Sequence, residues 1–418
     1  MAVKEYNVLD LFSGAGGLTE GFCQTNHFNM ISHVEMNIHA SMTLETRMLY
    51  YKLKENGLDE IYNEYMSNFD QKNARSVFLK KCSDNNIKST GVINEALSEN
   101  TLGDITSRIQ DNLGKKKIDV IIGGPPCQAY SSLSRWYQNI KESDPRLDLY
   151  KYYIQCLSKF KPRMFVFENV PGLQTIRNGD YFNIIQKCMT KEGYEIRMNI
   201  LDAADFGVIQ HRKRIIFIGW RKNEKPDIPV FEKKEPAGTV HDLIMEDLPI
   251  LNAGEGSVIQ EYRAGPNKYL RESGIRDNKQ NILLQHVVRP TCDRDKEIYR
   301  LAIIAMNEGR RIRYPELPEE LKTHRNQTSF IDRFKVVNEH GLSHSMLAHI
   351  SRDGHYYIHP DINHPRSLSV REAARIQSFP DNYIFEGPRG PQFVQIGNAV
   401  PPLMAKGIAE KIIECLSQ

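Results

Sequence analysis

The 418-residue sequence lacks several features that mark common classes of protein. No apolar run approaches the length needed to cross a bilayer, so a membrane-spanning helix is not expected. Its seven cysteines, at positions 23, 82, 127, 156, 188, 292 and 415, form no CxxC pair. Neither a zinc site nor a disulfide framework is therefore indicated, and six of the cysteines are expected to be buried or inert. No internal repeat or low-complexity tract occurs.

A strong charge of either sign is also absent. The net charge of +3 permits binding to nucleic acid without arguing for it. The 40% hydrophobic and 26% charged residues are ordinary for a soluble globular protein, and the length allows two or three domains. The chain is interpreted as an unprocessed intracellular protein.

What the sequence does contain is an alternation of strand-like and helix-like segments. Apolar strands are predicted at residues 6–12, 31–35, 118–122 and 164–168, with extended segments at 194–201 and 214–220. Helical patterns lie between them at residues 18–23, 148–160 and 180–192. This alternation of strands and helices predicts an α/β fold with a mostly parallel sheet and helices on both faces.

Two stretches interrupt this alternation. Residues 50–100 are polar, charged and helix-prone, and they predict a helical insertion that is either a solvated decoration or a surface for DNA or a partner. Regular alternation is lost again at about 245–345, which predicts a smaller, irregular domain. Helices are expected to return at 370–377 and at 401–416.

The first strand leads into a glycine-rich loop. Gly14, Gly16 and Gly17 would let the backbone approach a cofactor closely, but a dinucleotide fingerprint would need a further glycine where Thr19 stands. Glu35 follows Gly14 by 21 residues, a spacing suited to binding ribose hydroxyls. The loop predicts an adenosine-bearing cofactor without choosing NAD, FAD or S-adenosylmethionine. Asp104 is a candidate for the adenine amino group or an ordinary loop acid.

Three further motifs carry reactive side chains. Cys127 follows Gly-Gly-Pro-Pro in a stiff loop after a strand. It is a candidate nucleophile or, alternatively, a buried structural cysteine. Glu168 ends the next strand, where burial would raise its pKa and make it a proton donor, unless it only caps a helix or a loop. Gln210, Arg212 and Arg214 would share one face of a strand and suit an anion or a base edge, unless they form a solvated patch.

These motifs occur in one order with two more, Arg371-Glu-Ala-Ala-Arg-Ile-Gln and Gly397-Asn-Ala-Val-Pro-Pro. In this order the chain resembles the C5-cytosine DNA methyltransferases, bacterial type II modification methylases, over most of its length. Residues 50–100 and much of 245–345 lie outside the matching blocks. The resemblance implies a Rossmann-like fold that binds S-adenosylmethionine, together with a target-recognition domain.

The resemblance also implies catalytic roles. Cys127 would add to C6 of a flipped-out cytosine, with its thiol pKa lowered by Arg212 and Arg214. Glu168 would contact N3 and the exocyclic amine of the base and supply a proton to N3. Arg212 would steady the base carbonyl, and Arg214 would orient Glu168 and the loop. No metal is expected.

The cofactor residues follow from the same resemblance. They are Phe12, Gly14, Gly16, Gly17, Leu18, Glu35, Met36, Asp104, Ile105, Pro125, Leu149, Asn398 and Ala399. Relatives often have an aromatic residue where this chain has Met36, so adenine stacking is expected to be weaker or differently made.

The resemblance further divides the chain. It implies a catalytic and cofactor-binding domain at 1–235, target recognition at 236–365, a hinge and the end of the recognition domain at 366–395, and a closing helix at 396–418 that returns to the catalytic domain. The expected partner is duplex DNA with a specific cytosine site, with a cognate restriction endonuclease or defence system as a candidate. A monomer in the bacterial cytoplasm, associated with the nucleoid and not with a membrane, is expected.

The sequence disfavours four alternative functions. Enzymes that methylate exocyclic amines have Tyr or Phe after the prolines, so Cys127 disfavours them. The tRNA-cytosine branch of the family usually lacks a large recognition domain, which favours DNA here. Intact Cys127, Glu168 and Arg212 disfavour a DNA-binding protein with a dead active site, and Thr19 disfavours a dehydrogenase. The target sequence cannot be read from the chain.

Overall fold

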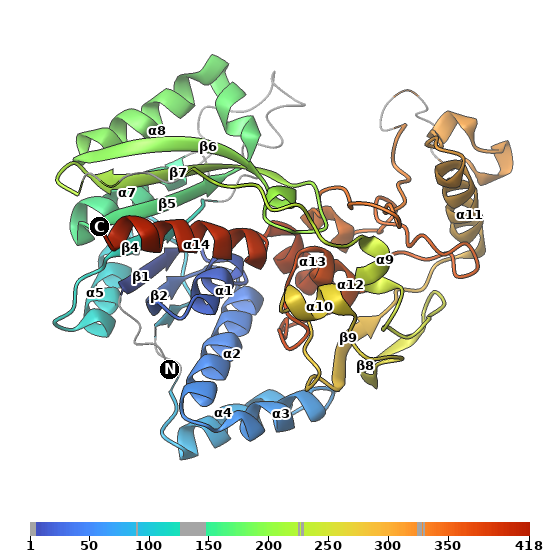
Figure 1. The fold of residues 1–418 in the computed structure, drawn as a ribbon, viewed down its shortest axis with the longest axis horizontal. Helices are drawn as coiled ribbons and strands as arrows, with labels where there is room; N and C mark the ends of the chain where they lie inside the picture. Colours follow the sequence, from blue (N-terminus) through green and yellow to red (C-terminus); the bar gives the residue numbers. More distant parts are fainter. Residues whose placement is uncertain are drawn as a thin grey trace.

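A computed structural model describes residues 6–88, 91–125, 148–224, 226, 230–323, 328 and 331–418, without the side chains of residues 175–178. In this structure a large α/β unit stands beside a part that contains a two-stranded sheet and a helical lobe (Figure 1). Within the described residues, no helix is long and apolar enough to cross a membrane.

The large unit is built on a seven-stranded sheet with the order β3-β2-β1-β4-β5-β7-β6. Its strands are β1 (Tyr6–Leu11), β2 (Phe28–Val34), β3 (Val92–Ile93), β4 (Val120–Gly123), β5 (Met164–Asn169), β6 (Tyr194–Asp202) and β7 (Lys213–Arg221). All neighbouring pairs are parallel except those of β7, which runs antiparallel to β5 and β6. The predicted mostly parallel sheet is confirmed. The strand order reverses between β1 and β4, so their carboxyl ends open a crevice.

Helices cover both faces of this sheet, as predicted. One face carries α5 (Leu102–Leu113), α7 (Leu149–Phe160) and α8 (Asp180–Lys191), and the other carries α1 (Gly17–Gln24) and α14 (Pro402–Leu416) (Figure 1). In β5, Phe165 and Phe167 pack into the first core, whereas Met164 and Val166 pack into the second. A strand buried on both faces must be apolar throughout, which explains its unbroken hydrophobic run.

The insertion forms α3 (Asp59–Ser67) and α4 (Ala74–Asp84), which follow α2 (Ile38–Glu55). Its aromatic side chains pack in one cluster with Leu284 of the small sheet and with Ile384. The Tyr62 hydroxyl donates a hydrogen bond to the carbonyl of Asn382 at 2.8 Å. The insertion is therefore more than a solvated decoration, because it joins the large unit to the second part. The two-residue strand β3 was not predicted.

The second part contains the antiparallel strands β8 (Gly256–Glu261) and β9 (Ile282–Val287). Its helices are α9 (Val240–Ile244), α10 (Lys268–Glu272), α11 (Asp293–Asn307), α12 (Val370–Ile376) and α13 (Arg389–Asn398). Its short 3-10 turns are η4 (Tyr314–Glu316), η5 (Glu319–Leu321) and η6 (Ala348–Ser351), whereas η2 (Pro171–Gly179) and η3 (Ala203–Asp205) belong to the large unit. Helices α9, α10, α12 and α13 share one core, whereas α11 packs on a separate cluster and projects from the body (Figure 1).

Candidate active site

The glycine-rich loop begins where β1 ends. Phe12 has a φ of +56°, a left-handed conformation that is costly for a residue with a side chain. Gly14 and Gly16 follow with φ of +55° and +80°. Such a strained turn at the carboxyl end of a central strand is typical of a functional site.

The end of α13 lies against this loop. A Cβ atom on Gly17 would stand 2.2 Å from the Val400 carbonyl oxygen and 3.1 Å from Ala399 Cβ. Ala399 is therefore adjacent to the loop, although it is almost four hundred residues away in the sequence. Asn398 is exposed beside it, and Leu18 is buried at the start of α1.

Glu35 joins the loop to the turn after β2. Its Oε2 accepts a hydrogen bond from the Gly14 N–H at 2.8 Å, and its Oε1 accepts one from the Asn37 N–H at 2.7 Å. Burial raises the pKa of Glu35, and these N–H groups oppose the shift. Asn94, which the sequence reasoning missed, donates its amide to the Glu35 and Met36 carbonyls at 2.9 and 3.1 Å. The Met36 side chain is 66% exposed.

The remaining cofactor candidates lie on neighbouring elements. Asp104 is exposed in the first turn of α5, 3.7 Å from the Arg108 guanidinium, and Ile105 is buried beneath it. Pro125 is buried just after β4, and Leu149 is half-buried at the start of α7. The contacts in the structure bring Gly14 to Glu35 and Gly17 to Ala399, but they do not join Asp104 to that group.

The loop after β4 starts against the end of β5. A Cβ on Gly123 would stand 1.9 Å from the Leu11 carbonyl oxygen, so β4 ends tightly against β1. A Cβ on Gly124 would stand 2.4 Å from the Glu168 carbonyl oxygen and 2.6 Å from Glu168 Oε2. Asn169 donates its amide to the Pro125 carbonyl at 3.3 Å. Cys127, two residues further on, lies outside the described residues.

Glu168 is paired with Arg214. The Arg214 Nε lies 2.7 Å from Glu168 Oε1, and the two side chains are only 9% and 15% exposed. Arg214 is the second residue of β7, the antiparallel neighbour of β5. The expected contact between the second arginine of the motif and this carboxylate is therefore present, and it places a charged pair beside the loop that leads to Cys127.

Gln210 and Arg212 have a different place from the one predicted. Because β7 begins at Lys213, both residues precede the strand, and the expectation that they share its face with Arg214 was wrong. The buried Arg212 guanidinium donates to the carbonyls of Met346 and, at 2.9 Å, Gly397. The side-chain amide oxygen (Oε1) of Gln210 accepts a hydrogen bond from the Met346 N–H at 2.7 Å. These two side chains hold the segment at 343–350 and the end of α13.

Thr19, which replaces the third glycine of a dinucleotide fingerprint, has its own partner. Its hydroxyl donates to Asp10 Oδ2 at 2.6 Å beneath the glycine loop. Burial raises the pKa of Asp10 to about 7. Across the part of the chain that the structure describes, no three His, Cys, Asp or Glu side chains gather as metal ligands.

The strand order, the glycine loop held by Glu35, and the Glu168–Arg214 pair define a Rossmann-like enzyme with a nucleotide-type cofactor crevice. Residues 67–414 match the family model described as C-5 cytosine-specific DNA methylase. Type II methyltransferase M.Bpa9945I of Bacillus paralicheniformis is 40% identical and is matched over 98% of this chain and 99% of its own length. The chain belongs to this family and is a DNA cytosine-5 methyltransferase, as the resemblance predicted.

Two more comparisons agree with this assignment. Type II methyltransferase M.DdeI of Desulfomicrobium norvegicum is 29% identical, over 97% of this chain and 88% of that protein. Among solved structures, a prophage-encoded Escherichia coli protein described as a DNA modification methyltransferase has a TM-score of 0.66 at 24% identity. That match covers 99% of this chain and all of the other, and it confirms the fold.

Proposed function

We propose that this methyltransferase modifies a flipped-out cytosine in one specific duplex sequence, with Cys127 as nucleophile and Glu168 as proton donor. The observation that carries the proposal is the position of Glu168, which lies between the Arg214 guanidinium and the Gly124 backbone. Because Gly124 starts the loop to Cys127, a carboxylate and a thiol would meet the same base from neighbouring strands.

The chemistry requires both groups. Cytosine C5 is a poor nucleophile, so the Cys127 thiolate first forms a bond to C6 while Glu168 supplies a proton to N3. This addition moves the electron pair of the C5–C6 double bond to the C4–C5 position, so that C5 becomes an enamine carbon. C5 would then take the methyl group of S-adenosylmethionine, whose sulfur keeps the electron pair of the broken bond as S-adenosylhomocysteine. Removal of the C5 proton by a base restores the C5–C6 double bond and expels the Cys127 thiolate, while N3 returns its proton to Glu168, so that no net oxidation occurs. The base must leave the duplex for this, at a cost of a few kcal/mol.

We assign the two arginines differently from the expectation drawn from the resemblance. Arg214 is the arginine placed beside the base, because it binds Glu168 directly. Arg212 shapes the site indirectly, since its guanidinium holds the Met346 and Gly397 carbonyls. A cationic environment that lowers the pKa of the Cys127 thiol would thus come mainly from Arg214.

The residues at the crevice fit S-adenosylmethionine, which supplies the methyl group. Glu35 presents a half-buried carboxylate for ribose hydroxyls, and Gly14, Gly16 and Gly17 have no side chains that would obstruct the loop. Phe12, Leu18, Met36, Asp104, Ile105, Pro125, Leu149, Asn398 and Ala399 are proposed to complete the site. Asn94 would hold the Glu35–Met36 turn in place.

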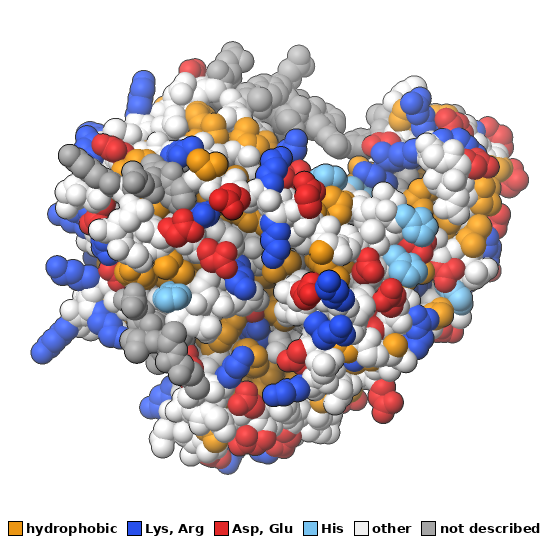
Figure 2. All heavy atoms as spheres, viewed as in Figure 1, with side chains coloured by type: hydrophobic (Ala, Val, Ile, Leu, Met, Phe, Trp, Pro, Cys, Tyr) orange, Lys and Arg blue, Asp and Glu red, His pale blue; other side chains and the backbone are white. Residues whose placement is uncertain are grey.

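Target recognition is assigned to residues 236–365, with 366–395 as the hinge and 396–418 as the return to the catalytic domain, residues 1–235. The irregular lobe around α11 supports this, because Lys, Arg and His side chains border the side of the lobe that faces the main body (Figure 2). Cationic side chains of this kind suit a phosphate backbone. The names of the type II relatives support a restriction-modification role with a cognate endonuclease. A monomer in the bacterial cytoplasm fits this proposal.

The proposal is tested by expressing the chain in a host that lacks DNA methylation and sequencing its DNA for 5-methylcytosine. One methylated motif is expected, which is lost with Cys127→Ser and kept with Cys188→Ser, a half-buried cysteine on α8. Duplexes with 5-fluorocytosine at that motif should then remain covalently attached to the wild type. Release of the enzyme requires a base to remove the C5 proton, and a fluorine at C5 cannot be removed in this way. Methylation by Cys127→Ser would overturn the covalent assignment, and methylation of RNA alone would overturn the substrate.

A further inference from the structure

The turn at residues 380–383 brings a buried tyrosine against the glycine loop. The Tyr383 hydroxyl donates a hydrogen bond to the carbonyl of Ala15, in the middle of that loop. A Cβ on Gly16 would stand 3.0 Å from the same hydroxyl oxygen, so the ring is packed directly on the loop backbone. Tyr383 has no exposed surface. Its hydroxyl is thus a direct polar contact between the turn and the loop, and it satisfies a buried carbonyl.

An arginine of α12 holds this turn. Arg371 donates from Nη2 to the Tyr383 carbonyl at 3.0 Å and from Nη1 to the Pro380 carbonyl at 3.1 Å. Its Nε donates to the carbonyl of Leu284, in β9, at 3.0 Å. One fully buried guanidinium therefore ties the turn to the small sheet of the second part, and a planar group with several fixed donors suits this task.

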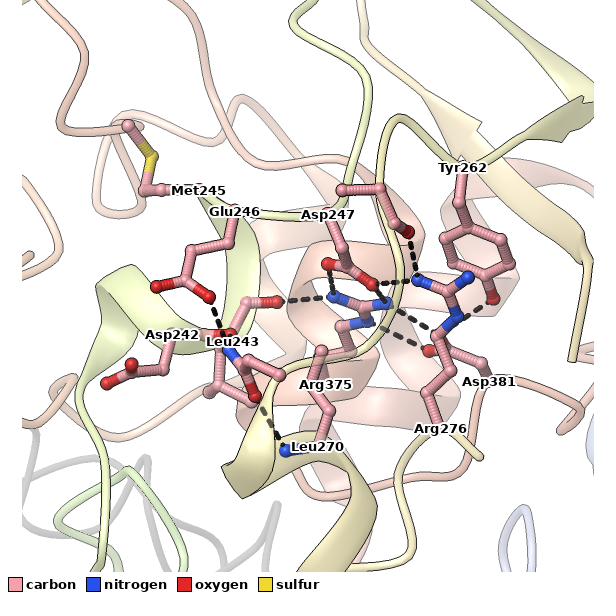
Figure 3. Close-up of polar contacts among 12 residues, drawn as sticks. Asp242, Leu243, Met245, Glu246, Asp247, Tyr262, Leu270, Arg276, Arg375 and Asp381 are labelled. Carbon is pink, nitrogen blue, oxygen red and sulfur yellow. Dashed lines mark hydrogen bonds and ion pairs between the residues drawn. The ribbon is translucent and has the colours of Figure 1, made fainter. Parts of the chain in front are cut away.

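A second arginine fixes the start of the same turn. Arg375 lies between Asp247 and Asp381, with bonds of 2.6 to 2.9 Å to both carboxylates (Figure 3). Arg276 donates to Asp247 Oδ2 at 2.6 Å, an oxygen that also accepts from Arg375, and the Tyr262 hydroxyl donates to Asp381 at 2.8 Å. Burial alone would raise the pKa of Asp381, but the Arg375 guanidinium holds it below its usual value. The carboxylate therefore stays charged and the turn stays anchored.

We propose that Tyr383 is a positioning residue for cofactor binding. Its hydroxyl fixes the Ala15 carbonyl and thereby the orientation of the peptide groups at Gly16 and Gly17. The arginines of α12 hold the turn that carries Tyr383 and tie it to the second part of the molecule. The loop therefore has its binding geometry only when the second part is packed against it. This inference rests on the proposed cofactor site, and it names a residue outside that site on which cofactor affinity depends.

The test compares Tyr383→Phe with Tyr194→Phe in the full chain. Both substitutions remove one buried hydroxyl that donates to a backbone carbonyl, but the Tyr194 hydroxyl binds the Pro162 carbonyl at 2.9 Å, outside the turn and the loop. Binding of S-adenosylhomocysteine is measured by calorimetry. Tyr383→Phe should raise its Kd about five- to tenfold, the size expected for one lost hydrogen bond. The KM for S-adenosylmethionine should rise similarly with little change in kcat, and Tyr194→Phe should change neither.

A second readout does not depend on the ligand. Amide hydrogen exchange at residues 14–17 should be faster in Tyr383→Phe than in Tyr194→Phe at equal Tm. An unchanged Kd in Tyr383→Phe, or the same loss in Tyr194→Phe, would overturn the positioning role while the proposed function stands. A wild-type protein that binds no S-adenosylhomocysteine would overturn the proposed cofactor, and the inference with it.

Discussion

The guanidinium Nε of Arg214 lies 2.7 Å from Glu168 Oε1, across the antiparallel pair of strands β7 and β5. On its other side the same carboxylate packs on the backbone of Gly124. Glu168 is thus held from two directions, by a cation on one neighbouring strand and by the loop from the other. A carboxylate restrained in this way is placed for one proton transfer, because its position is fixed before the base arrives.

Arg214→Lys should lower the rate of methyl transfer by about a hundredfold while the Tm changes little. A lysine keeps the charge, but it lacks the planar donors that orient the carboxylate. The measurement is single-turnover transfer at saturating S-adenosylmethionine. Arg163→Lys is the matched control, because Arg163 forms a similar pair with Glu224 at 2.8 Å away from the site. Equal losses in the two variants would show that the Arg214 pair has no special role.

Arg212→Ala should act mainly on stability. The change leaves the Met346 and Gly397 carbonyls without a charged donor inside the protein, which costs about 2–4 kcal/mol of unfolding free energy. Urea titration measures this loss, and the rate of transfer should recover partly when the assay temperature is lowered. A fully stable variant with no activity would instead show that Arg212 contacts the base, as the resemblance implied.

Gly124→Ala should abolish transfer. The new Cβ would stand 2.4 Å from a backbone oxygen of Glu168, so the loop to Cys127 must move, and a displacement of about 1 Å can cost a hundredfold in rate. Gly390→Ala, at a position where a Cβ meets no atom within 4 Å, is the control. The comparison is of kcat at equal Tm. An active Gly124→Ala enzyme would contradict the close contact between Gly124 and Glu168 as a requirement for transfer.

The alternation of strands and helices and the family could be predicted because local patterns carry them. The central strands β4 and β5 are short apolar runs, and the motifs that carry the resemblance are short segments of consecutive residues. The contact between Glu168 and Arg214 was implied by the resemblance. The position of Arg212 was predicted wrongly, because period-two alternation holds only inside a strand and β7 begins one residue after Arg212.

Contacts between distant segments could not be predicted from one sequence. The packing of Tyr383 on Ala15 joins residues more than 360 positions apart, and no local pattern encodes it. The resemblance implied that Gly17 and Ala399 belong to one site, but not that they pack directly on each other. The two-residue strand β3 and the packing of the insertion on β9 depend in the same way on tertiary partners. Asn94 was missed because a lone asparagine after a short strand has no distinctive signal.

Exchanging residues 250–345 for those of a relative should change the methylated sequence, if target recognition lies there. Arg276 would be replaced in such a chimera, and Asp247 would then keep only the Arg375 guanidinium. Chimeras without a cation at position 276 should therefore unfold more readily, by about 1–3 kcal/mol. Sequencing of host DNA reads the specificity, and urea titration reads the stability. A chimera that methylates the original motif would move recognition elsewhere, for instance to the insertion.

Asp10→Asn should change how stability depends on pH. Burial raises the pKa of Asp10 from 3.8 to about 7, so between these values the folded protein keeps a proton that the unfolded chain has lost. The stabilising effect of that proton is full below pH 3.8 and disappears as the pH rises to about 7, at roughly 1.4 kcal/mol per pH unit. Asparagine can still accept the Thr19 bond but does not titrate. The unfolding free energy of the variant, relative to wild type, should therefore rise between pH 5 and pH 7 in urea titrations, whereas a constant difference would contradict the raised pKa.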